Sequence, residues 1–289
     1  MKKVTEKAYA KINLGLNILG QRDDGYHEVS MIMQSLALCD DVVISEGKAS
    51  GTITAETDMP GLGCGSDNLA CRAAALLAGH CGITPNVHIV LKKRIFLAAG
   101  LAGGSSDAAA VLRGLNRLWK LNLSNDELRV IGARLGSDVP FCIEGGTALA
   151  TGRGEIITQC EDLPETAVVL AKPKDLEIST AWVYRNYNAG RVVHAPKIWC
   201  LKENIGSGPR ALMPYMANVL ETVTIPANPV IASVKAAMLG GGAYFAMMSG
   251  SGPTVFALAD NMESAERVQQ ALGDFAVETV ITATNRRMK

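Results

Sequence analysis

The sequence has no net charge, no paired-cysteine motif and no long apolar run, and each absence excludes a class of protein. Its 28 Lys and Arg residues balance 28 Asp and Glu residues, so bulk electrostatics give no reason to expect a nucleic acid or an anionic membrane as partner. The seven cysteines form no CxxC pair, which disfavours a disulfide framework or a zinc site and favours reduced thiols in a cytoplasm. No run approaches the roughly 18 apolar residues of a membrane-spanning helix. We therefore expect a cytoplasmic protein.

The composition is that of an ordinary globular protein, with one exception. Of the 289 residues, 48% are hydrophobic and 19% are charged, which argues against disorder and predicts one large domain or two of ordinary size. Glycine is the exception, at 29 residues against a background of about 7% of a chain. The excess indicates that the chain has several turns or close backbone approaches, and the positions of the glycines show where.

The patterning predicts strands mixed with helices. In the first half the expected strands are 12–18, 42–46, 87–91 and 143–149, and the expected helices are 67–78, 107–120 and 125–135. In the second half we expect helices at 229–239 and 263–272 and strands at 244–248, 254–259 and 277–282. Residues 188–214 have little periodicity and several Gly and Pro residues, which is typical of a loop. Without strict alternation of strand and helix, an α+β fold is favoured, with a domain boundary near 155–165.

The helix ends carry recognisable signals. Ser66 is a suitable N-cap for the helix at 67–78, which we expect to end at Gly79. Ser124 with Glu127 predicts a capping box at the start of the helix at 125–135.

The first glycine cluster, within Ala98–Ala109, leads directly into the helix predicted at 107–120. Glycine allows a close backbone approach and positive φ without Cβ strain, and Ser105 and Ser106 add hydroxyls where the free N–H groups of a helix start converge. That combination predicts a phosphate site. An ordinary tight loop with a Ser N-cap is the alternative.

The cluster does not match the commoner motifs. It has no GxxxxGK[ST], which excludes a P-loop, and no GxGxxG after a strand, which leaves a dinucleotide fold unsupported. It also lacks GxSxG, so neither serine is predicted to be a nucleophile.

Two more clusters lie in the last third. Gly240–Gly242 is interpreted as a helix stop, whereas Met248–Thr254 contains two serines, two glycines and a threonine between strand-like runs. The second segment can form a hairpin turn or a nest of donors for another anion.

Three motifs in order resemble those of the GHMP kinases. They are Ala10–Leu14 (AKINL), the Gly100–Ala109 loop and Ser249–Thr254 (SGSGPT). The resemblance implies a two-domain fold, with residues 1–158 as an ATP-binding domain like the second domain of ribosomal protein S5 and residues 159–289 as a ferredoxin-like domain. It also implies ATP as phosphoryl donor, with Mg²⁺ bound to ATP, because no carboxylate cluster marks a dedicated metal site.

Two further stretches narrow the resemblance to one branch of the family. Asp24–Glu28 (DGYHE) and Gly136–Phe141 (GSDVPF) resemble the branch that phosphorylates the 2-hydroxyl of a cytidine diphosphate-linked methylerythritol in the non-mevalonate route to isoprenoid precursors. The chain departs from the family pattern at Tyr9, Phe96, Ala102 and Val219, where Pro, Pro, Gly and Asp are usual. None of these departures removes a group that would perform chemistry.

The resemblance assigns roles to individual residues. Taken alone, Asp138 before Pro140 is more typical of an ordinary surface turn. The resemblance instead aligns Asp138 with the family's catalytic base, and Lys11 is expected to work with it by stabilising the developing alkoxide. Lys11 also lies between apolar neighbours in a predicted strand, so a partly buried ammonium should pair there with a carboxylate or a phosphate. The implied ATP-binding residues are Asn68, Lys93, Ala98, Ala99, Gly100, Leu101, Ala102, Gly103, Gly104, Ser105, Ser106 and Asp107.

The substrate's base is expected to meet aromatic side chains. Tyr26 can stack on a base, His27 can contact its polar edge, and Tyr184 aligns with a second stacking aromatic, although it can also be an ordinary core residue. The full set of implied substrate-binding residues is Asn13, Tyr26, His27, Thr180, Tyr184, Ser249, Gly250, Ser251 and Gly252.

Two alternatives remain open. A GHMP kinase for homoserine or mevalonate would share the fold, but neither substrate has a base to stack on Tyr26 or Tyr184. A catalytically inactive ligand sensor would not need both Lys11 and Asp138. The expected partner is a small molecule, and the chain is expected to be a monomer or a weak homodimer.

Overall fold

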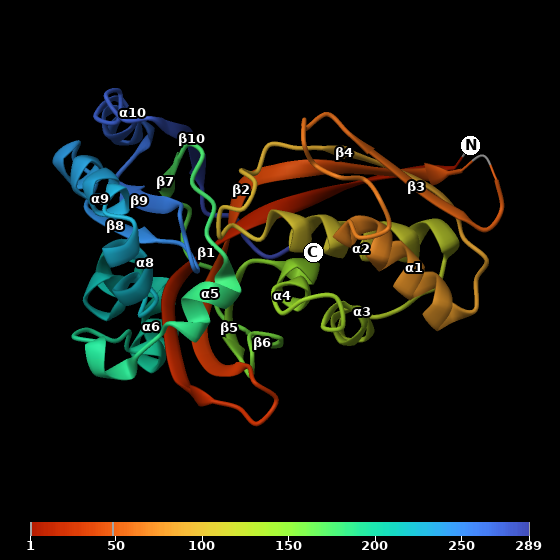
Figure 1. Cartoon of the computed structure of the whole chain (residues 1–289), viewed down its shortest axis with the longest axis horizontal. Coiled ribbons are helices and arrows are strands. Elements are labelled where there is room, and N and C mark those ends of the chain that lie inside the picture. The colour runs from red at the N-terminus through yellow and green to blue at the C-terminus, as the bar shows by residue number, and fades with distance from the viewer. Residues whose placement is uncertain (1, 48, 289) are drawn as a thin grey trace. The chain divides into compact units, whose positions relative to one another are not determined.

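The computed structural model describes residues 2–47 and 49–288 (Figure 1). The chain forms two compact units whose segments alternate along the sequence. Unit 1 consists of the residues up to Ala10, Leu38–Ile95 and Ala102–Glu144. Unit 2 consists of Lys11–Ala37, Phe96–Leu101 and the residues from Gly145 onward.

Two long strands, β1 (Lys3–Gln21) and β2 (His27–Glu46), contribute residues to both units. They include the strands predicted at 12–18 and 42–46, which are therefore confirmed but longer than expected. The expected domain boundary between residues 158 and 159 falls inside unit 2 and stays a prediction.

Unit 1 packs helices against paired strands. Strand β4 (Asn86–Lys92) pairs antiparallel with Asp41–Glu46 of β2 and parallel with β3 (Thr52–Thr57), a strand that was not predicted. The alternation along β4 buries every second side chain, at Val87, Ile89 and Leu91. The helices of this unit are α1 (Leu69–Cys81), α2 (Gly103–Trp119), α3 (Asn125–Gly132) and α4 (Val139–Glu144).

Helix α1 begins and ends later than predicted. Its N-cap is Asn68, whose Oδ1 accepts a hydrogen bond from the N–H of Ala70 at 2.9 Å, and not Ser66. Gly79 lies inside the helix. The helix ends instead at its C-cap Gly82, whose φ of 64° is in the left-handed region that glycine adopts easily. The capping box of Ser124 and Glu127 is confirmed at the start of α3.

The strand predicted at 143–149 is wrong in its first half. Residues Val139–Glu144 form α4, and strand β5 (Thr147–Thr151) begins only after Gly145 and Gly146, which have φ of 66° and 75°. These two glycines reverse the chain between helix and strand, and a run of apolar residues does not distinguish a short buried helix from a strand.

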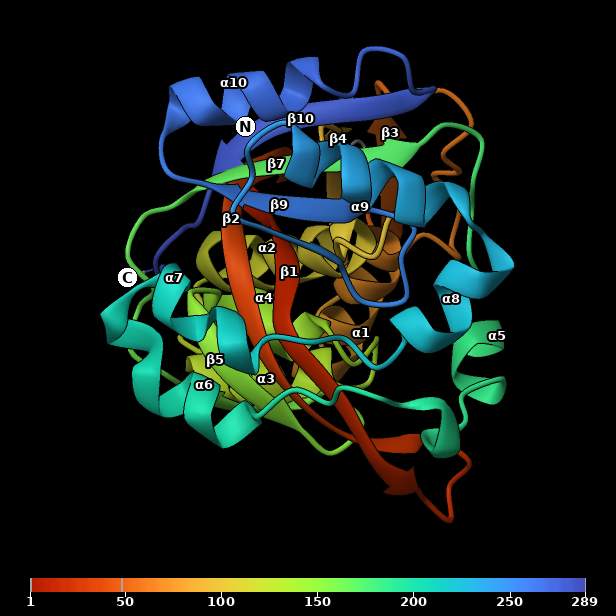
Figure 2. The same ribbon diagram turned by 90° about the vertical axis from the view of Figure 1, so that its left-hand side faces the viewer.

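Unit 2 contains a four-stranded antiparallel sheet in the order β10-β7-β9-β8. The strands are β7 (Ala167–Pro173), β8 (Phe245–Met248), β9 (Val255–Ala259) and β10 (Val277–Ala283). Helix α9 (Val230–Gly240) packs on β8 and β9, and α10 (Met262–Gln270) packs on β7 and β10, with both helices on one face of the sheet (Figure 2). The β-α-β-β-α-β sequence of these elements and their spatial order are those of a ferredoxin-like fold. Unit 2 also has β5 paired with β6 (Ile156–Gln159).

The loop predicted at 188–214 is partly wrong. This stretch contains α6 (Ile198–Asn204) and α7 (Pro209–Leu212), preceded and followed by 3-10 turns. Leu201, Ile205 and Leu212 are fully buried and anchor it. The helices are too short to produce a recognisable periodicity, and Gly208 with Pro209 separates them.

Two other short helices of unit 2 are α5 (Thr180–Arg185) and α8 (Glu221–Ala227).

Within residues 2–47 and 49–288, no single helix is long and apolar enough to cross a membrane. Helices α8 and α9 meet the length and composition requirement only when they are taken together, and they are bent by 104° at the break between them.

Candidate active site

Residues of all three motifs named above meet at one backbone carbonyl in unit 2. The ammonium Nζ of Lys11 donates to the carbonyl oxygen of Gly100 at 3.0 Å, and Ser249 Oγ donates to the same oxygen at 3.0 Å. The N–H of Lys11 also donates to the carbonyl of Leu101 at 3.1 Å. Strand β1, the glycine loop and the turn after β8 are therefore joined through Gly100.

Gly100 could not be another residue in this arrangement. Its φ of 72° lies in the left-handed region, and a Cβ built on it would lie 2.3 Å from the carbonyl oxygen of Ser249. Any side chain would have to displace backbone atoms of the turn after β8. The close approach of two backbones is the physical reason for glycine at this position.

The ammonium of Lys11 is buried, as predicted. The residue is 4% exposed, and Nζ also donates to Asn13 Oδ1 at 2.9 Å. Asn13 is fully buried, and its Nδ2 lies 3.2 Å from Met31 Sδ. Lys11 and Asn13 thus share one face of β1, as their spacing indicates. The expected pairing of Lys11 with a carboxylate or phosphate stays a prediction.

The turn at Ser249–Gly252 is held from two sides. Ser251 Oγ lies 2.9 Å from Thr180 Oγ1, the hydroxyl of the first residue of α5. Asn218, which sequence reasoning missed, donates from Nδ2 to the carbonyls of Met248 (2.9 Å) and Gly250 (2.7 Å). Because Asn218 is 4% exposed, its amide is committed to shaping this turn.

Among the aromatic candidates in unit 2, the rings of His27 and Tyr184 lie against each other, and Tyr26 lies beside a cation. The ring centroids of His27 and Tyr184 are 5.4 Å apart, and Tyr187 meets His27 edge-on at 6.5 Å. The guanidinium of Arg153 lies 5.2 Å from the centre of the Tyr26 ring, and Tyr26 is 53% exposed. Tyr187 and Arg153 were not predicted. An exposed aromatic ring beside a cation is suited to stacking on a planar base.

The start of α2 in unit 1 has the geometry of an anion site. Ala102 precedes the helix with φ 59°, and the first N–H groups, at Gly103, Gly104 and Ser105, have no acceptor within the helix. Ser105 is half-buried, whereas Ser106 is buried and its hydroxyl donates to the carbonyl of Tyr9 at 2.6 Å. The donors left at the helix start are N–H groups and one hydroxyl, which fit a phosphate.

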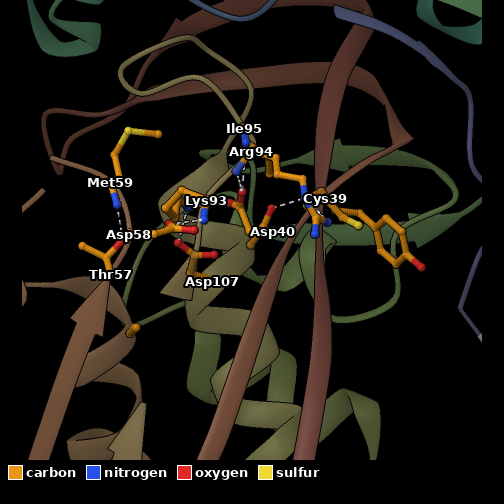
Figure 3. Close-up of polar contacts among 12 residues, drawn as sticks. Cys39, Asp40, Thr57, Asp58, Met59, Lys93, Arg94, Ile95 and Asp107 are labelled. Carbon is orange, nitrogen blue, oxygen red and sulfur yellow. Dashed lines mark hydrogen bonds and ion pairs between the residues drawn. The ribbon is translucent and has the colours of Figure 1, made fainter. Parts of the chain in front are cut away.

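A buried ionic triad lies behind this helix start (Figure 3). Lys93 Nζ lies 2.5 Å from Asp40 Oδ2 and 2.5 Å from Asp107 Oδ2, and all three side chains are at most 4% exposed. Burial raises the pKa of Asp107 to about 7, against the lowering effect of Lys93. Burial acts to lower the pKa of Lys93, but the two carboxylates outweigh it and raise that pKa.

Of the remaining candidates, Asp138 is half-buried in unit 1 directly before α4, where its carbonyl accepts the N–H of Cys142 at 3.2 Å. Asn68 uses both ends of its amide locally, because Oδ1 caps α1 and Nδ2 donates to the carbonyl of Gly63 at 2.8 Å. The catalytic and binding roles of these residues stay predictions.

A dedicated metal site is not evident in the part of the chain that the structure describes, which contains no group of three His, Cys, Asp or Glu side chains able to hold an ion. The donors at the start of α2 fit the phosphates of a nucleotide and do not fit a bare cation.

Comparison with known proteins identifies the class. Residues 68–146 match the family model described as GHMP kinases N terminal domain, and residues 200–278 match GHMP kinases C terminal. The homoserine kinase of Cytophaga hutchinsonii has the same fold, with a TM-score of 0.73 at 18% identity over 99% of this chain and 96% of that chain. The two family matches show that the chain belongs to the GHMP kinases.

More similar proteins identify the branch. The chain is 46% identical over 289 residues to 4-diphosphocytidyl-2-C-methyl-D-erythritol kinase of Acetivibrio thermocellus. The alignment covers 98% of this chain and 100% of the relative. A crystal structure of 4-(cytidine 5'-diphospho)-2C-methyl-D-erythritol kinase aligns with a TM-score of 0.82 at 32% identity, over 98% of this chain and 99% of that one. The chain therefore belongs to the family of the 4-diphosphocytidyl-2-C-methyl-D-erythritol kinases.

Replacement of Gly100 by alanine tests the meeting point of the three motifs. Gly100→Ala should destabilise the protein by at least about 2 kcal/mol in urea unfolding, because left-handed strain of roughly 1–2 kcal/mol adds to the clash with Ser249. The matched control is Gly104→Ala. Gly104 lies in α2, and a Cβ built there would meet only Leu69 Cδ1, at the ordinary contact distance of 3.4 Å. The control should keep its stability or gain up to about 1 kcal/mol. Equal stability of the two variants would contradict the close approach at Gly100.

Proposed function

We propose that the chain transfers the γ-phosphoryl group of ATP to the 2-hydroxyl of 4-diphosphocytidyl-2-C-methyl-D-erythritol, in the non-mevalonate route to isoprenoid precursors. The observation that carries the proposal is the convergence of Lys11, Ser249 and the glycine loop on the Gly100 carbonyl, in a chain 46% identical over its length to a kinase named for this substrate.

In the proposed reaction the hydroxyl oxygen forms a bond to the γ-phosphorus while the bond from that phosphorus to the β,γ-bridging oxygen breaks. ADP leaves, and the proton of the hydroxyl passes to the carboxylate of Asp138. The N–H groups of Gly103, Gly104 and Ser105 would hold phosphate oxygens at the positive end of α2. Lys11, whose ammonium is fixed by Asn13 and Gly100, would stabilise charge developing on the acceptor oxygen.

Mg²⁺ would be bound through the phosphates of ATP and would neutralise their charge during transfer. No residue set of this chain is assigned to it. For the cytidine base we propose a stacking role for Tyr26 and Tyr184 and a polar contact from His27. The contact of the His27 and Tyr184 rings and the exposed ring of Tyr26 beside Arg153 support these roles. The seven free cysteines are consistent with the cytoplasmic location that we propose. The oligomeric state, a monomer or a weak homodimer, stays a prediction.

The activity is tested by measuring ADP formation from ATP with 4-diphosphocytidyl-2-C-methyl-D-erythritol, homoserine and mevalonate in parallel. Turnover is expected with the cytidine-linked alcohol alone. Preferential turnover of homoserine or mevalonate would contradict the proposed substrate and indicate another kinase of the same fold. Absence of turnover with all three alcohols would contradict the kinase activity and indicate a ligand sensor.

The base role of Asp138 predicts a large loss of rate. Asp138→Asn should lower kcat by at least about 100-fold, because the amide cannot accept the hydroxyl proton. The control is Asp126→Asn, an exposed aspartate of α3 with a side chain that is 87% accessible, which should keep normal kcat. Near-normal kcat for Asp138→Asn would assign the base role to another group.

The stacking role of Tyr184 predicts a selective effect on one substrate. Tyr184→Ala should raise KM for the cytidine-linked alcohol about 5- to 150-fold, from loss of roughly 1–3 kcal/mol of stacking, and leave KM for ATP nearly unchanged. Trp182→Ala, on the same short helix α5, is the matched control and should change neither value. Equal increases of both KM values in Tyr184→Ala would make Tyr184 a structural residue only.

A further inference from the structure

Lys93 and Asp107, two of the predicted ATP-binding residues, form a buried triad with Asp40, and its three members come from separate elements of unit 1. Asp40 lies on β2, Lys93 directly follows β4, and Asp107 is in the second turn of α2 (Figure 3). A Cβ built on Gly103 would be 3.8 Å from Lys93 Nζ, so the ammonium lies directly behind the first turn of α2. The triad thus joins two strands to the helix start that is proposed to hold phosphate.

The same triad fixes the chain that leads into the glycine loop. Asp40 Oδ1 accepts the N–H groups of Arg94 (2.5 Å) and Ile95 (2.9 Å), and the N–H of Lys93 donates to Asp58 Oδ1 at 2.9 Å. Three successive N–H groups before the loop are therefore bound by carboxylates. On the other side of the loop, Asp107 ties α2 to the same lysine.

The charges of the triad do not balance. Two carboxylates share one ammonium, and Asp107 Oδ1 is buried without a hydrogen-bond partner in the described part of the chain. A buried site with an excess negative charge is costly unless it takes up a proton. Asp107 is the member suited to that proton, because both oxygens of Asp40 already accept hydrogen bonds.

We propose, on the basis of the proposed function, that the Asp40–Lys93–Asp107 triad is a positioning network for the nucleotide's phosphates, and that anion binding at the start of α2 is coupled to proton uptake by Asp107. A phosphate held by the first N–H groups of α2 adds negative charge near the triad, and like charge favours the protonated form of a carboxyl group. Asp40 and Lys93 act through the position of the helix start and not through contact with substrate.

The other acidic groups near the triad already have partners, so Asp107 is the group that we expect to take up the proton. From β2, Asp41 faces away and pairs with Lys7 and Arg94. From the segment after β3, Asp58 is bound to the N–H of Lys93. From α1, the apolar Leu69 approaches the helix start, where a Cβ built on Gly104 would meet its Cδ1 at 3.4 Å. Burial raises the pKa of Asp107 to about 7, which places its titration near neutral pH.

Proton uptake is measured by calorimetric titration of the unmodified protein with the non-hydrolysable β,γ-imido analogue of ATP and Mg²⁺, at pH 7 in two buffers of different ionisation enthalpy. A net uptake of a fraction of a proton should accompany each nucleotide bound, after subtraction of the proton change of the analogue itself. Binding without net uptake would overturn the coupling. Failure of the analogue to bind would overturn the proposed function itself, which separates the two conclusions.

Three variants assign the proton and the positioning role. Asp107→Asn keeps the size of the side chain and should bind the analogue without proton uptake, whereas uptake in Asp107→Asn would assign the proton to another group. Asp40→Asn should raise KM for ATP by at least about tenfold and change KM for the alcohol less than about twofold. Asp126→Asn, distant on α3, should match the unmodified protein in both measurements. Equal changes of both KM values in Asp40→Asn would reduce the triad to a general stabilising role.

Discussion

The carbonyl oxygen of Gly100 accepts hydrogen bonds from Lys11 and Ser249, two side chains that are more than 200 residues apart in the chain. A carbonyl with two buried donors can take only one orientation without leaving a polar group unpaired. The orientation of Gly100 in turn fixes the backbone of the glycine loop at this residue. Because a Cβ at this position would meet the backbone of Ser249, the contact depends on glycine as well as on the two donors.

The loop that passes through Gly100 contains unusual strain. Ala98, Gly100 and Ala102 all have positive φ, and for alanine this conformation costs roughly 1–2 kcal/mol per residue. At position 102, where this chain has alanine, the family pattern usually has glycine. In unit 1, the chain before the loop is bound by Asp40 at the N–H groups of Arg94 and Ile95, and Lys93 links Asp107 of α2 to the same carboxylate.

Local signals predicted much of this architecture. The strands β4, β8, β9 and β10 and the capping box of α3 were confirmed, because each follows from periodicity or from residues that are close in sequence. Strand β7 of the same sheet was not predicted. The three motifs were recognised for the same reason. The helix at 139–144 was mistaken for a strand, since a short apolar run carries no period that separates the two.

The groups that sequence reasoning missed are those that act through long-range contacts. Asn218 supports the turn after β8, Arg153 covers Tyr26, and Asp40 pairs with Lys93 across 53 residues. Nothing in the neighbouring residues distinguishes Asp40 from Asp41, although one is buried in the triad and the other pairs with Arg94 and Lys7. Such roles depend on the register of paired strands, which a single sequence does not specify.

The shared carbonyl is tested most directly by a double-mutant cycle of Lys11→Met and Ser249→Ala on the free energy of unfolding. Each single variant leaves Gly100 one donor, whereas the double variant leaves its carbonyl without both. The double variant should therefore lose more stability than the sum of the single losses, by at least about 0.5 kcal/mol. Additive losses, within about 0.3 kcal/mol, would contradict a common acceptor for the two side chains.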